Sequence, residues 1–579
     1  MKRLWEYMKP YKRLAILAPI LMLLEVGAEL AMPKLMTFMI NQGVGTGNTA
    51  IITKTGIEML VIAIIGIIGG IGCLICATLV SQRTGTDLRR AAFEKIQEFS
   101  FHNIDTFSTP SLITRLTNDI TQIQLVIMIC LRMLVRSPLL CIGSIIMAFS
   151  INAKIAGMFL IVVVLLAIAV YLILRVAMPK FKMVQEKLDK VNTVMRECLA
   201  GIRVVKAFVR HDYEVKKFNE VNQDYKETTV GAFRMMLLMS PVMMILVNGT
   251  IIGILWFGGL QTQAGNMHIE EIMACITYLM QMMMATMLLA MNFMFISRAK
   301  ISTDRLEEIL DTVVDIADPK EPKQPARAEG RVEYRHVSYR YKLGSGDPVL
   351  DDISFTAEPG QTVGILGETG SGKSTLVNLL PRLYDVTGGQ ILVDGIDVRD
   401  YAIHDLRKRV AVVLQETILF SGTIRENIKW GKPDATDEEI IAAAKAAQAH
   451  DFIMELPDQY DTELGQRGVN VSGGQKQRIS IARALIQNPN IIIFDDSTSA
   501  VDSLTEKRIR QAMKTSHSGC TKFIIAQRIS SVRDADKILV LGGGKIVAEG
   551  NHKYLMETNT EYQEILASQM KKGVMADGE

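Results

Sequence analysis

The pattern of hydrophobic residues divides the chain into two unlike halves. Residues 1–300 contain six apolar runs, each long enough to cross a hydrocarbon core as a helix of about 20 residues. From about residue 330 onward, short apolar strands alternate with polar helical segments, as in a soluble α/β domain. The pattern predicts a helical membrane domain followed by an α/β domain. The predicted spans lie near 14–41, 56–82, 125–150, 155–178, 232–260 and 270–297.

The domain boundaries follow from this change of pattern. We expect the transmembrane domain over 1–310, a linker rich in proline and charge over 311–329, the α/β domain over 330–570 and a polar tail over 571–579.

The connections between the apolar runs differ in length and charge. The segments 42–55, 151–154 and 261–269 are short and poor in cations. The segments 83–124 and 179–231 are long, helical in pattern and rich in Arg and Lys. The positive-inside rule therefore places both termini, the two long connections and the α/β domain in the cytoplasm of a multi-pass protein of the cell membrane.

Each long connection has a tip where the helical pattern breaks, near 103–116 and 208–221. A short helix at such a tip could contact a cytoplasmic domain, and an ordinary surface loop is the alternative. The balance of 64 Lys and Arg against 61 Asp and Glu, net +3, gives no sign of a nucleic-acid partner. The mean hydropathy of +0.21 agrees with a protein embedded in a lipid bilayer.

Polar and methionine side chains inside the spans are candidates for substrate binding, because ionisable groups in a membrane are costly and usually functional. Glu25 and Glu29 lie one turn apart on one helix face, since side chains four residues apart share a face. Methionine adapts to varied apolar ligands, although lipid contact or core packing is the simpler explanation for any one residue. The remaining candidates are Asn248, Asn292 and the methionine face of the sixth span: Met280, Met284, Met287, Met291 and Met294.

The strongest motif is "GETGSGKS" at 367–374, which matches G-x-x-x-x-G-K-[ST] in full. It follows the apolar strand "TVGIL" and opens the helix "STLVNLLPRLY", the context that a phosphate-binding P-loop requires. Backbone N–H groups between Gly367 and Gly372 would hold the phosphates, Lys373 would reach the β and γ oxygens, and Ser374 would ligate Mg²⁺. The predicted nucleotide contacts on this loop are Gly367, Gly370, Gly372, Lys373, Ser374 and Thr375.

Two further segments belong to phosphate chemistry. The strand "NIIIFDD" at 490–496 places Asp495 at its end, where it could hold Mg²⁺ directly or through water. The second segment is the predicted start of a helix, which lies in sequence between the P-loop and this strand. It begins about a hundred residues after the P-loop, and a helix start is a position that binds anions. We expect that one monomer does not bring this helix start and its own P-loop to the same phosphate. The residues at this helix start are Ser472, Gly473, Gly474 and Gln475.

These motifs and their order resemble an ATP-binding cassette (ABC) exporter half-transporter of the multidrug type, over essentially the whole chain. The resemblance implies ATP and Mg²⁺ as cofactors and two nucleotide domains dimerised head to tail, with two ATP molecules between them. It also implies that Tyr341 stacks on adenine, that Gln415 senses the γ-phosphate and the metal, and that Asp502 crosses the dimer interface. The tips at 103–116 and 208–221 correspond to the family's coupling helices.

The sequence departs from the family at two catalytic positions. Family members that hydrolyse ATP carry Glu directly after the strand-end Asp, and this chain has Asp496. They also carry a switch His where this chain has Gln527. A carboxylate shortened by one methylene sits back from the attacking water, and loss of a general base typically costs roughly 10²–10⁴ in rate. Gln527 can hydrogen-bond a phosphate but cannot carry a proton. Both changes predict a site that binds ATP and hydrolyses it slowly or not at all.

The family's signature motif is "SGGQ", and it is intact here at residues 472–475. An intact signature suggests that this chain completes a competent ATP site on another chain. We therefore expect a heterodimer with a homologous half-transporter that carries the catalytic Glu and the switch His, resembling heterodimeric bacterial multidrug exporters. The expected function is ATP-driven export of small amphipathic drugs or lipids by alternating access. The alternatives are a regulatory membrane protein gated by ATP without transport, and a homodimeric exporter of lipids or peptides with two slow sites.

Overall fold

The computed structural model describes residues 2–341, 347–497, 500–564 and 566–567, so the predicted tail at 571–579 lies outside the described residues. Within these ranges, some side chains are not described: those of residues 2, 174, 290, 291, 293, 294, 297, 298, 503 and 516. The chain forms two compact units. The helical unit holds Met1–Gln97 and Ser108–Thr312, and the α/β unit holds Glu98–Phe107 and the chain from Val313 onward.

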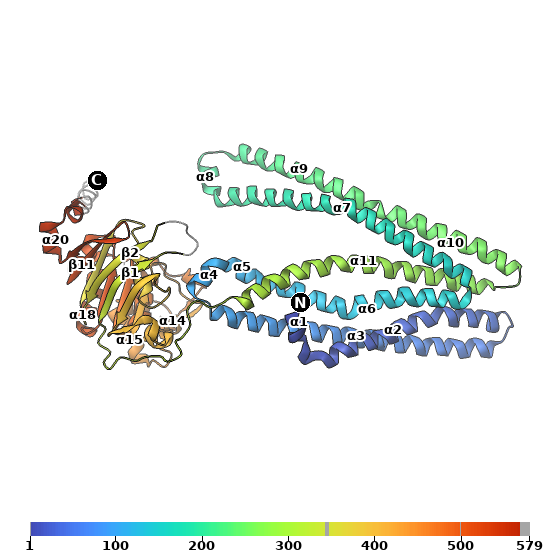
Figure 1. Ribbon diagram of the computed structural model, residues 1–579, viewed down its shortest axis with the longest axis horizontal. Helices are drawn as coiled ribbons and strands as arrows, with labels where there is room; N and C mark the ends of the chain where they lie inside the picture. The colour runs from blue at the N-terminus through green and yellow to red at the C-terminus, as the bar shows by residue number, and fades with distance from the viewer. Residues whose placement is uncertain (1, 342–346, 498–499, 565, 568–579) are drawn as a thin grey trace. The chain divides into compact units, whose positions relative to one another are not determined.

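The helical unit consists of long helices joined by short turns (Figure 1). Its helices are α1 (Lys2–Met8), α2 (Lys12–Phe38), α3 (Thr49–Gln97), α5 (Thr109–Thr114), α6 (Ile120–Ile151), α7 (Ala153–Ala200), α8 (Ile202–Ala207), α9 (His211–Leu237), α10 (Met239–Gln263) and α11 (Ile269–Asp311).

Among the described residues, six helical stretches are long and apolar enough to cross a membrane, which confirms the six predicted spans. Several helices continue far beyond their apolar run: α3 has 49 residues and α7 has 48. These polar extensions run into the connections 83–124 and 179–231, which the sequence predicts to be helical. At the second predicted tip the short helix is α8, which ends at Ala207, and the range 208–221 contains a turn and the start of α9.

Small residues bring α2 and α3 together. A Cβ added at Gly66 would lie 2.9 Å from the Ala28 Cβ, and one added at Gly69 would lie 2.8 Å from the Leu21 carbonyl oxygen. Inside a bilayer, where apolar burial offers little drive for association, such close backbone approach is a main source of helix packing energy.

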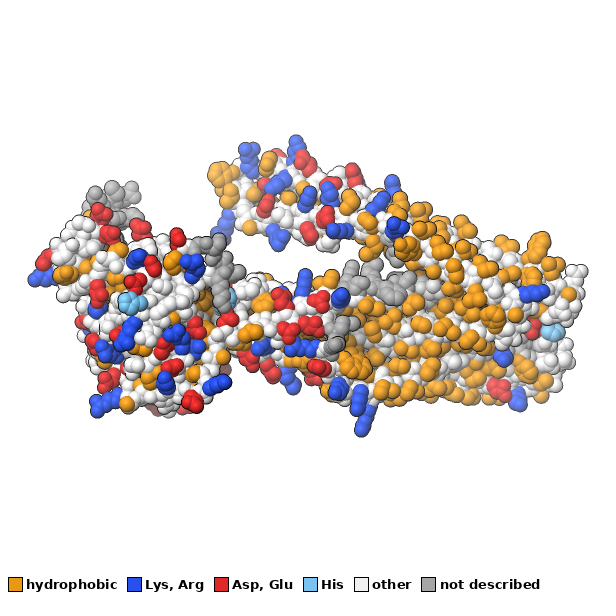
Figure 2. Space-filling model, viewed as in Figure 1, with side chains coloured by type: hydrophobic (Ala, Val, Ile, Leu, Met, Phe, Trp, Pro, Cys, Tyr) orange, Lys and Arg blue, Asp and Glu red, His pale blue; other side chains and the backbone are white. Residues whose placement is uncertain are grey.

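Hydrophobic and charged side chains occupy different parts of the helical unit (Figure 2). Exposed Ile and Leu side chains cover the middle of α3, as at Ile64, Ile67, Ile68 and Ile71. Figure 2 shows Lys, Arg, Asp and Glu gathered along the arm that ends at α8. An apolar middle with charged ends is the surface that a bilayer requires.

The described residues of the α/β unit form three sheets. Its strands are β1 (Val332–Tyr339), β2 (Leu350–Ala357), β3 (Thr362–Gly367), β4 (Gly388–Val393), β5 (Ile396–Asp397), β6 (Val410–Val413), β7 (Gly422–Thr423), β8 (Glu463–Leu464), β9 (Ile491–Asp495), β10 (Thr521–Ile525), β11 (Lys537–Gly542) and β12 (Lys545–Gly550). The sheets have the orders β2-β1-β4-β5, β12-β11-β3-β10-β9-β6 and β7-β8.

Helices accompany these sheets. They are α4 (Phe101–Phe107), α12 (Lys373–Leu379), α13 (Ile403–Arg409), α14 (Ile424–Lys429), α15 (Asp437–Ala446), α16 (His450–Met454), α17 (Gly473–Leu485), α18 (Ser503–Ser516), α19 (Ile529–Val532) and α20 (His552–Thr558). Six membrane helices and this α/β unit confirm the predicted fold class.

The six-stranded sheet positions the phosphate motifs. Strand β10 pairs in parallel with β3 on one side and with β9 on the other, placing Ile525 opposite both Ile365 and Asp495. Because the carboxyl ends of parallel strands meet at one sheet edge, the loops after Gly367, Asp495 and Ile525 are neighbours. Segments that are about 30 to 160 residues apart in sequence therefore share one site.

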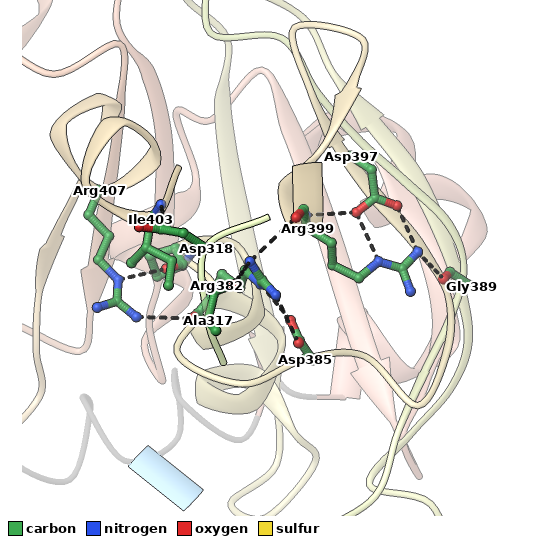
Figure 3. Close-up of polar contacts among 10 residues, drawn as sticks. Ala317, Asp318, Arg382, Asp385, Gly389, Asp397, Arg399, Ile403 and Arg407 are labelled. Atoms are coloured by element: carbon green, nitrogen blue, oxygen red, sulfur yellow. Dashed lines mark hydrogen bonds and ion pairs between the residues drawn. The ribbon is translucent and has the colours of Figure 1, made fainter. Parts of the chain in front are cut away.

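The linker predicted over 311–329 is bound to the rest of the α/β unit by the Arg382 side chain and by the Ile403 backbone (Figure 3). Arg382, only 6% exposed, donates to the Ala317 carbonyl at 3.2 Å and forms an ion pair with Asp385 at 2.8 Å. The Ile403 N–H donates to the Asp318 carboxylate at 2.7 Å. These contacts make residues 317–318 part of the fold of the α/β unit.

Candidate functional site

The P-loop joins β3 to α12 through glycines whose backbone most other residues avoid. Gly370 and Gly372 have φ of 86° and 93°, in the left-handed region. At Gly367 a side chain has no room, because its Cβ would lie 2.4 Å from the Leu541 carbonyl oxygen. The loop therefore turns tightly enough to direct backbone N–H groups at a bound phosphate.

Lys373 is the first residue of α12, and its side chain folds back over the P-loop. Its Nζ donates to the carbonyl oxygens of Gly367, at 2.9 Å, and Glu368, at 2.6 Å. Burial lowers the pKa of Lys373, while the carboxylates of Asp495 and Asp496 act to raise it. This ammonium group is placed to contact the phosphates of a nucleotide.

Asp495 and Ser374 form a hard-oxygen pair at the end of β9. The Ser374 hydroxyl donates to the Asp495 carboxylate at 2.9 Å, and Asp495 is 4% exposed. Burial raises the pKa of Asp495 above its usual range. A carboxylate and a hydroxyl at this spacing suit Mg²⁺, which prefers oxygen ligands and phosphate oxygens. When bound, Mg²⁺ would neutralise charge on the β and γ phosphate oxygens.

Asp496 and Gln527, the two residues that depart from the family pattern, contact one another. The Gln527 Nε2 donates to the Asp496 Oδ2 at 3.0 Å. The backbone of Asp496 lies in the left-handed region, with φ of 46°, and its N–H donates to the Ile525 carbonyl at 3.1 Å. Burial raises the pKa of Asp496. The short carboxylate is therefore held by an amide that cannot accept or release a proton.

These groups line one cleft of about 230 Å³. The cleft brings together half of the residues predicted for the nucleotide and the metal, among them Gln415, which is exposed after β6. The lining residues are Val349, Thr369, Gly370, Gly372, Lys373, Ser374, Thr375, Gln415, Asp495, Asp496, Ile525 and Gln527.

Tyr341 lies at the end of an aromatic cluster beside the P-loop helix. Its hydroxyl is 3.2 Å from the Thr375 hydroxyl. Its ring packs edge-on against Tyr339 and Tyr384, with centroid distances of 4.9 Å and 5.6 Å. A ring fixed in this way could stack on a base.

The signature residues form the start of α17. Ser472 is the N-cap: its hydroxyl accepts from the Gln475 N–H at 3.3 Å, while its own N–H donates to the Gln475 side chain at 2.8 Å. A Cβ at Gly474 would lie 2.8 Å from the Ala500 carbonyl oxygen. None of the four signature residues is among the described residues that line the P-loop cleft. The N–H groups of Ser472 and Gln475 are thus engaged within the cap itself.

Asp502 caps α18, which sequence reasoning did not foresee. Its carboxylate accepts from the Thr505 N–H at 2.9 Å, and this hydrogen bond lowers its pKa. Asp502 ends the segment "SAVD" at 499–502, and position 499 lies outside the described residues.

In the helical unit, the predicted acidic pair meets a partner that sequence reasoning missed. Arg136 of α6 pairs with Glu29 at 2.9 Å and with Glu25 at 3.6 Å. Glu25, Glu29 and Arg132 also line a shallow, mostly apolar cleft of about 410 Å³ between α2 and α3. The sequence could have indicated this partner, because Arg132 and Arg136 are two arginines one turn apart inside the apolar run 125–150.

The other substrate candidates divide by exposure. Met280, Met284 and Met287 are 41% to 65% exposed, whereas their neighbours Met282 and Met283 pack in the core. Asn248 is exposed, and Asn292 is 7% exposed with its Nδ2 unpaired among the described residues. The side chains of Met291 and Met294 lie outside the described residues.

The fold and the cleft together define a membrane protein that binds ATP, and comparison with known proteins agrees. The family model described as ABC transporter transmembrane region matches residues 15–286, and the one described as ABC transporter matches residues 350–499. The chain belongs to the ABC transporter family.

Its relatives cover nearly the whole chain. It is 41% identical over 569 residues, 98% of both chains, to the uncharacterized ABC transporter ATP-binding protein YfiB of Bacillus subtilis. It is 34% identical to an ATP-dependent lipid A-core flippase of Syntrophus aciditrophicus, over 86% of this chain and 82% of that one. A solved bacterial Atm1-family ABC exporter with ATP bound matches with a TM-score of 0.79 at 25% identity, over 96% of this chain and 98% of that one.

The chain is therefore a multi-pass membrane protein of the ABC exporter type whose nucleotide domain binds ATP and powers transport. These matches bear out the family predicted from the motifs.

Proposed function

We propose that this chain is one subunit of a heterodimeric ABC exporter, and that its own P-loop site holds ATP without hydrolysing it at a useful rate. The hydrogen bond between Gln527 and Asp496 carries this proposal. A base needs its carboxylate free and within about 2.6–3.2 Å of the attacking water. Here the only carboxylate in the base position is one methylene short and is engaged by an amide.

The signature at the start of α17 supports a division of labour between two chains. Its capping box is complete, and its four residues stand apart from the P-loop cleft of the same chain. A second nucleotide domain is needed to bring a P-loop to it. We propose that the partner supplies the catalytic Glu and the switch His, while Tyr341, Gln415, Asp495 and Asp502 of this chain keep the family roles that the sequence predicts.

The proposed substrate is a small amphipathic drug or lipid. The exposed Met280, Met284 and Met287 offer an adaptable apolar surface. Two relatives support a lipid-like substrate by name: the lipid A-core flippase, and a fatty acid ABC transporter ATP-binding/permease protein of Mycobacterium tuberculosis, 36% identical over 84% of this chain and 76% of that one.

A homodimeric exporter is the second candidate. That second relative is named as a single chain with both ATP-binding and permease parts, as this chain has, and such a chain can pair with itself. In that case both ATP sites would carry Asp496 and Gln527, and the protein would turn over slowly without another chain.

Purification from the native source with an affinity tag, followed by ATPase measurement, separates these cases. We expect a second ABC chain to co-purify and the pair to hydrolyse ATP far faster than this chain alone. In the pair, Asp496→Asn should leave the ATPase rate within about twofold of the parent, because Asp496 is not the working base. A large loss of rate, or rapid turnover by this chain alone, would contradict the proposal.

A further inference from the structure

A second cleft in the α/β unit is lined by basic side chains. It encloses about 430 Å³ between α18, the start of β10 and α19. Five cationic residues line it, against one acidic residue, Asp534. We refer to it as the basic cleft, and its cationic residues are Lys507, Arg510, Lys514, Lys522 and Arg533.

The cations come from several elements. Lys507, Arg510 and Lys514 are spaced i, i+3, i+7 on α18, so they lie on one face, while Ile509 and Met513 of the same helix are buried. That face alone would be an ordinary solvated surface. Arg533 follows α19, and Lys522 belongs to β10, so cationic residues from more than one element line the cleft.

Lys522 is the unusual member, because lysine is almost never buried without a paired charge. It is 5% exposed, and its Nζ donates to the carbonyl oxygens of His517, at 3.0 Å, and Cys520, at 2.7 Å. A lysine ammonium has three N–H donors, so one remains. Burial lowers its pKa; the nearby Asp536 acts to raise it, and the charge of Lys514 lowers it further. An anion in the cleft would relieve this repulsion.

From these contacts we propose that the basic cleft binds a small soluble anion carrying two or more phosphate groups. Lys507 and Lys514 are two helical turns apart, about 10 Å, which exceeds the reach of a single phosphate. Thr362, Ser530 and Ser531 also line the cleft, and a Ser or Thr hydroxyl can donate to a phosphate oxygen. This site is separate from the P-loop cleft, with which it shares no lining residue among those described.

Occupancy of the basic cleft would act on the ATP site through the chain itself. Helix α18 follows the loop after Asp496, and α19 begins two residues after Gln527. Arg510 already ties the two helices by donating to the carbonyl oxygens of Ser530, at 3.2 Å, and Ser531, at 2.8 Å. An anion spanning the cleft would reinforce this link and hold the pair formed by Asp496 and Gln527. The state of this chain's ATP site would thus respond to a cytoplasmic phosphate compound.

The test uses the full-length chain in nanodiscs of neutral phosphatidylcholine, with Lys373→Ala to remove phosphate binding at the P-loop. Inorganic tripolyphosphate is titrated at constant ionic strength, and binding is followed by calorimetry. We expect saturable binding that becomes roughly tenfold weaker or more in Lys507→Gln/Lys514→Gln, the loss of two charge-assisted contacts. Hydrogen exchange over 503–516 and 529–534 should slow on binding in the parent.

The matched control is Lys445→Gln/Lys553→Gln, which removes the same charge from exposed positions on α15 and α20. It should bind as the parent does. Absence of saturable binding, or equal affinity in the two double variants, would overturn the proposal. A parallel sample in anionic-lipid nanodiscs without tripolyphosphate tests lipid headgroups as the source. Slowed exchange in that sample alone would overturn the assignment to a soluble anion.

Discussion

The two units hold buried charge in different ways. In the α/β unit, Lys373 is bound by two backbone carbonyls and Asp495 by a neighbouring hydroxyl, so each charge has a partner set by the P-loop. In the helical unit, Glu25 and Glu29 depend on Arg136, a side chain from another helix, and the Glu25 Oε2 and Arg136 Nε have no hydrogen-bond partner among the described residues. Charges held by a local motif are robust, whereas charges held only by distant side chains are vulnerable to one substitution.

The largest effect should follow from removing the P-loop charge. Lys373→Ala should weaken ATP binding to this chain by about 100-fold, roughly 2.7 kcal/mol, because charge-assisted hydrogen bonds to phosphate are lost. Photolabelling of this chain with an azido-ATP analogue measures the change. Lys445→Gln removes an exposed lysine elsewhere and should label normally. If Lys373→Ala is labelled to within twofold of the parent, the P-loop is not part of the ATP-binding site.

Restoring the family residues should raise hydrolysis. Asp496→Glu with Gln527→His should increase the ATPase rate of the chain roughly tenfold to a hundredfold, since a well-placed base contributes 10²–10⁴. Asp496→Glu alone should give a smaller rise, because Gln527 still engages the carboxylate. Steady-state phosphate release is the measurement. An unchanged rate in the double variant would show that the slow step lies outside these two positions.

In the helical unit, Arg136→Ala should destabilise the fold by about 2 kcal/mol. Breaking a fully buried pair costs about 3–5 kcal/mol, and these side chains are 19% to 33% exposed, so the effect is reduced. The unfolding midpoint in detergent reports it. Arg132→Ala is the matched control, one turn away and without an ion pair among the described residues, and should cost less. Equal losses would mean that the pairs with Glu25 and Glu29 carry no special weight.

The smallest effect concerns α4, which belongs to the α/β unit. The Tyr384 hydroxyl donates to the Asp105 carboxylate at 2.9 Å, and the Tyr384 ring lies 6.0 Å from that of Phe101. Tyr384→Phe removes only the hydrogen bond and should cost about 1 kcal/mol, seen as faster hydrogen exchange over 101–107. Tyr554→Phe, at an exposed position on α20, should change nothing there.

The difference between the units also explains what the sequence could predict. The P-loop residues could be located one by one, because strand, glycine turn and helix are contiguous and glycines at φ near 90° leave few alternatives. The six spans followed from apolar length alone. Asp495 could be placed because a buried strand, β9, ends there.

Other features depend on tertiary contacts and could not be predicted in this way. The contact between Asp496 and Gln527 joins residues 31 apart across β9 and β10, and only the sheet order makes them neighbours. The pairing of Arg136 with Glu29 joins residues 107 apart on different helices. The capping role of Asp502 differs from these, because it depends on local sequence. An Asp directly before a helix, with a free N–H at position N3, would have indicated it.

The arginine contacts with the linker bear on how the soluble part can be isolated. A fragment cut at residue 330, where the strand pattern begins, would lose the Ala317 carbonyl that Arg382 binds and the Asp318 carboxylate that caps α13 at Ile403. Arg382 would then be left buried with one of its acceptors gone. A fragment starting at Val313 keeps both contacts, so we expect the seventeen residues before 330, though irregular in structure, to make the separated α/β part more stable.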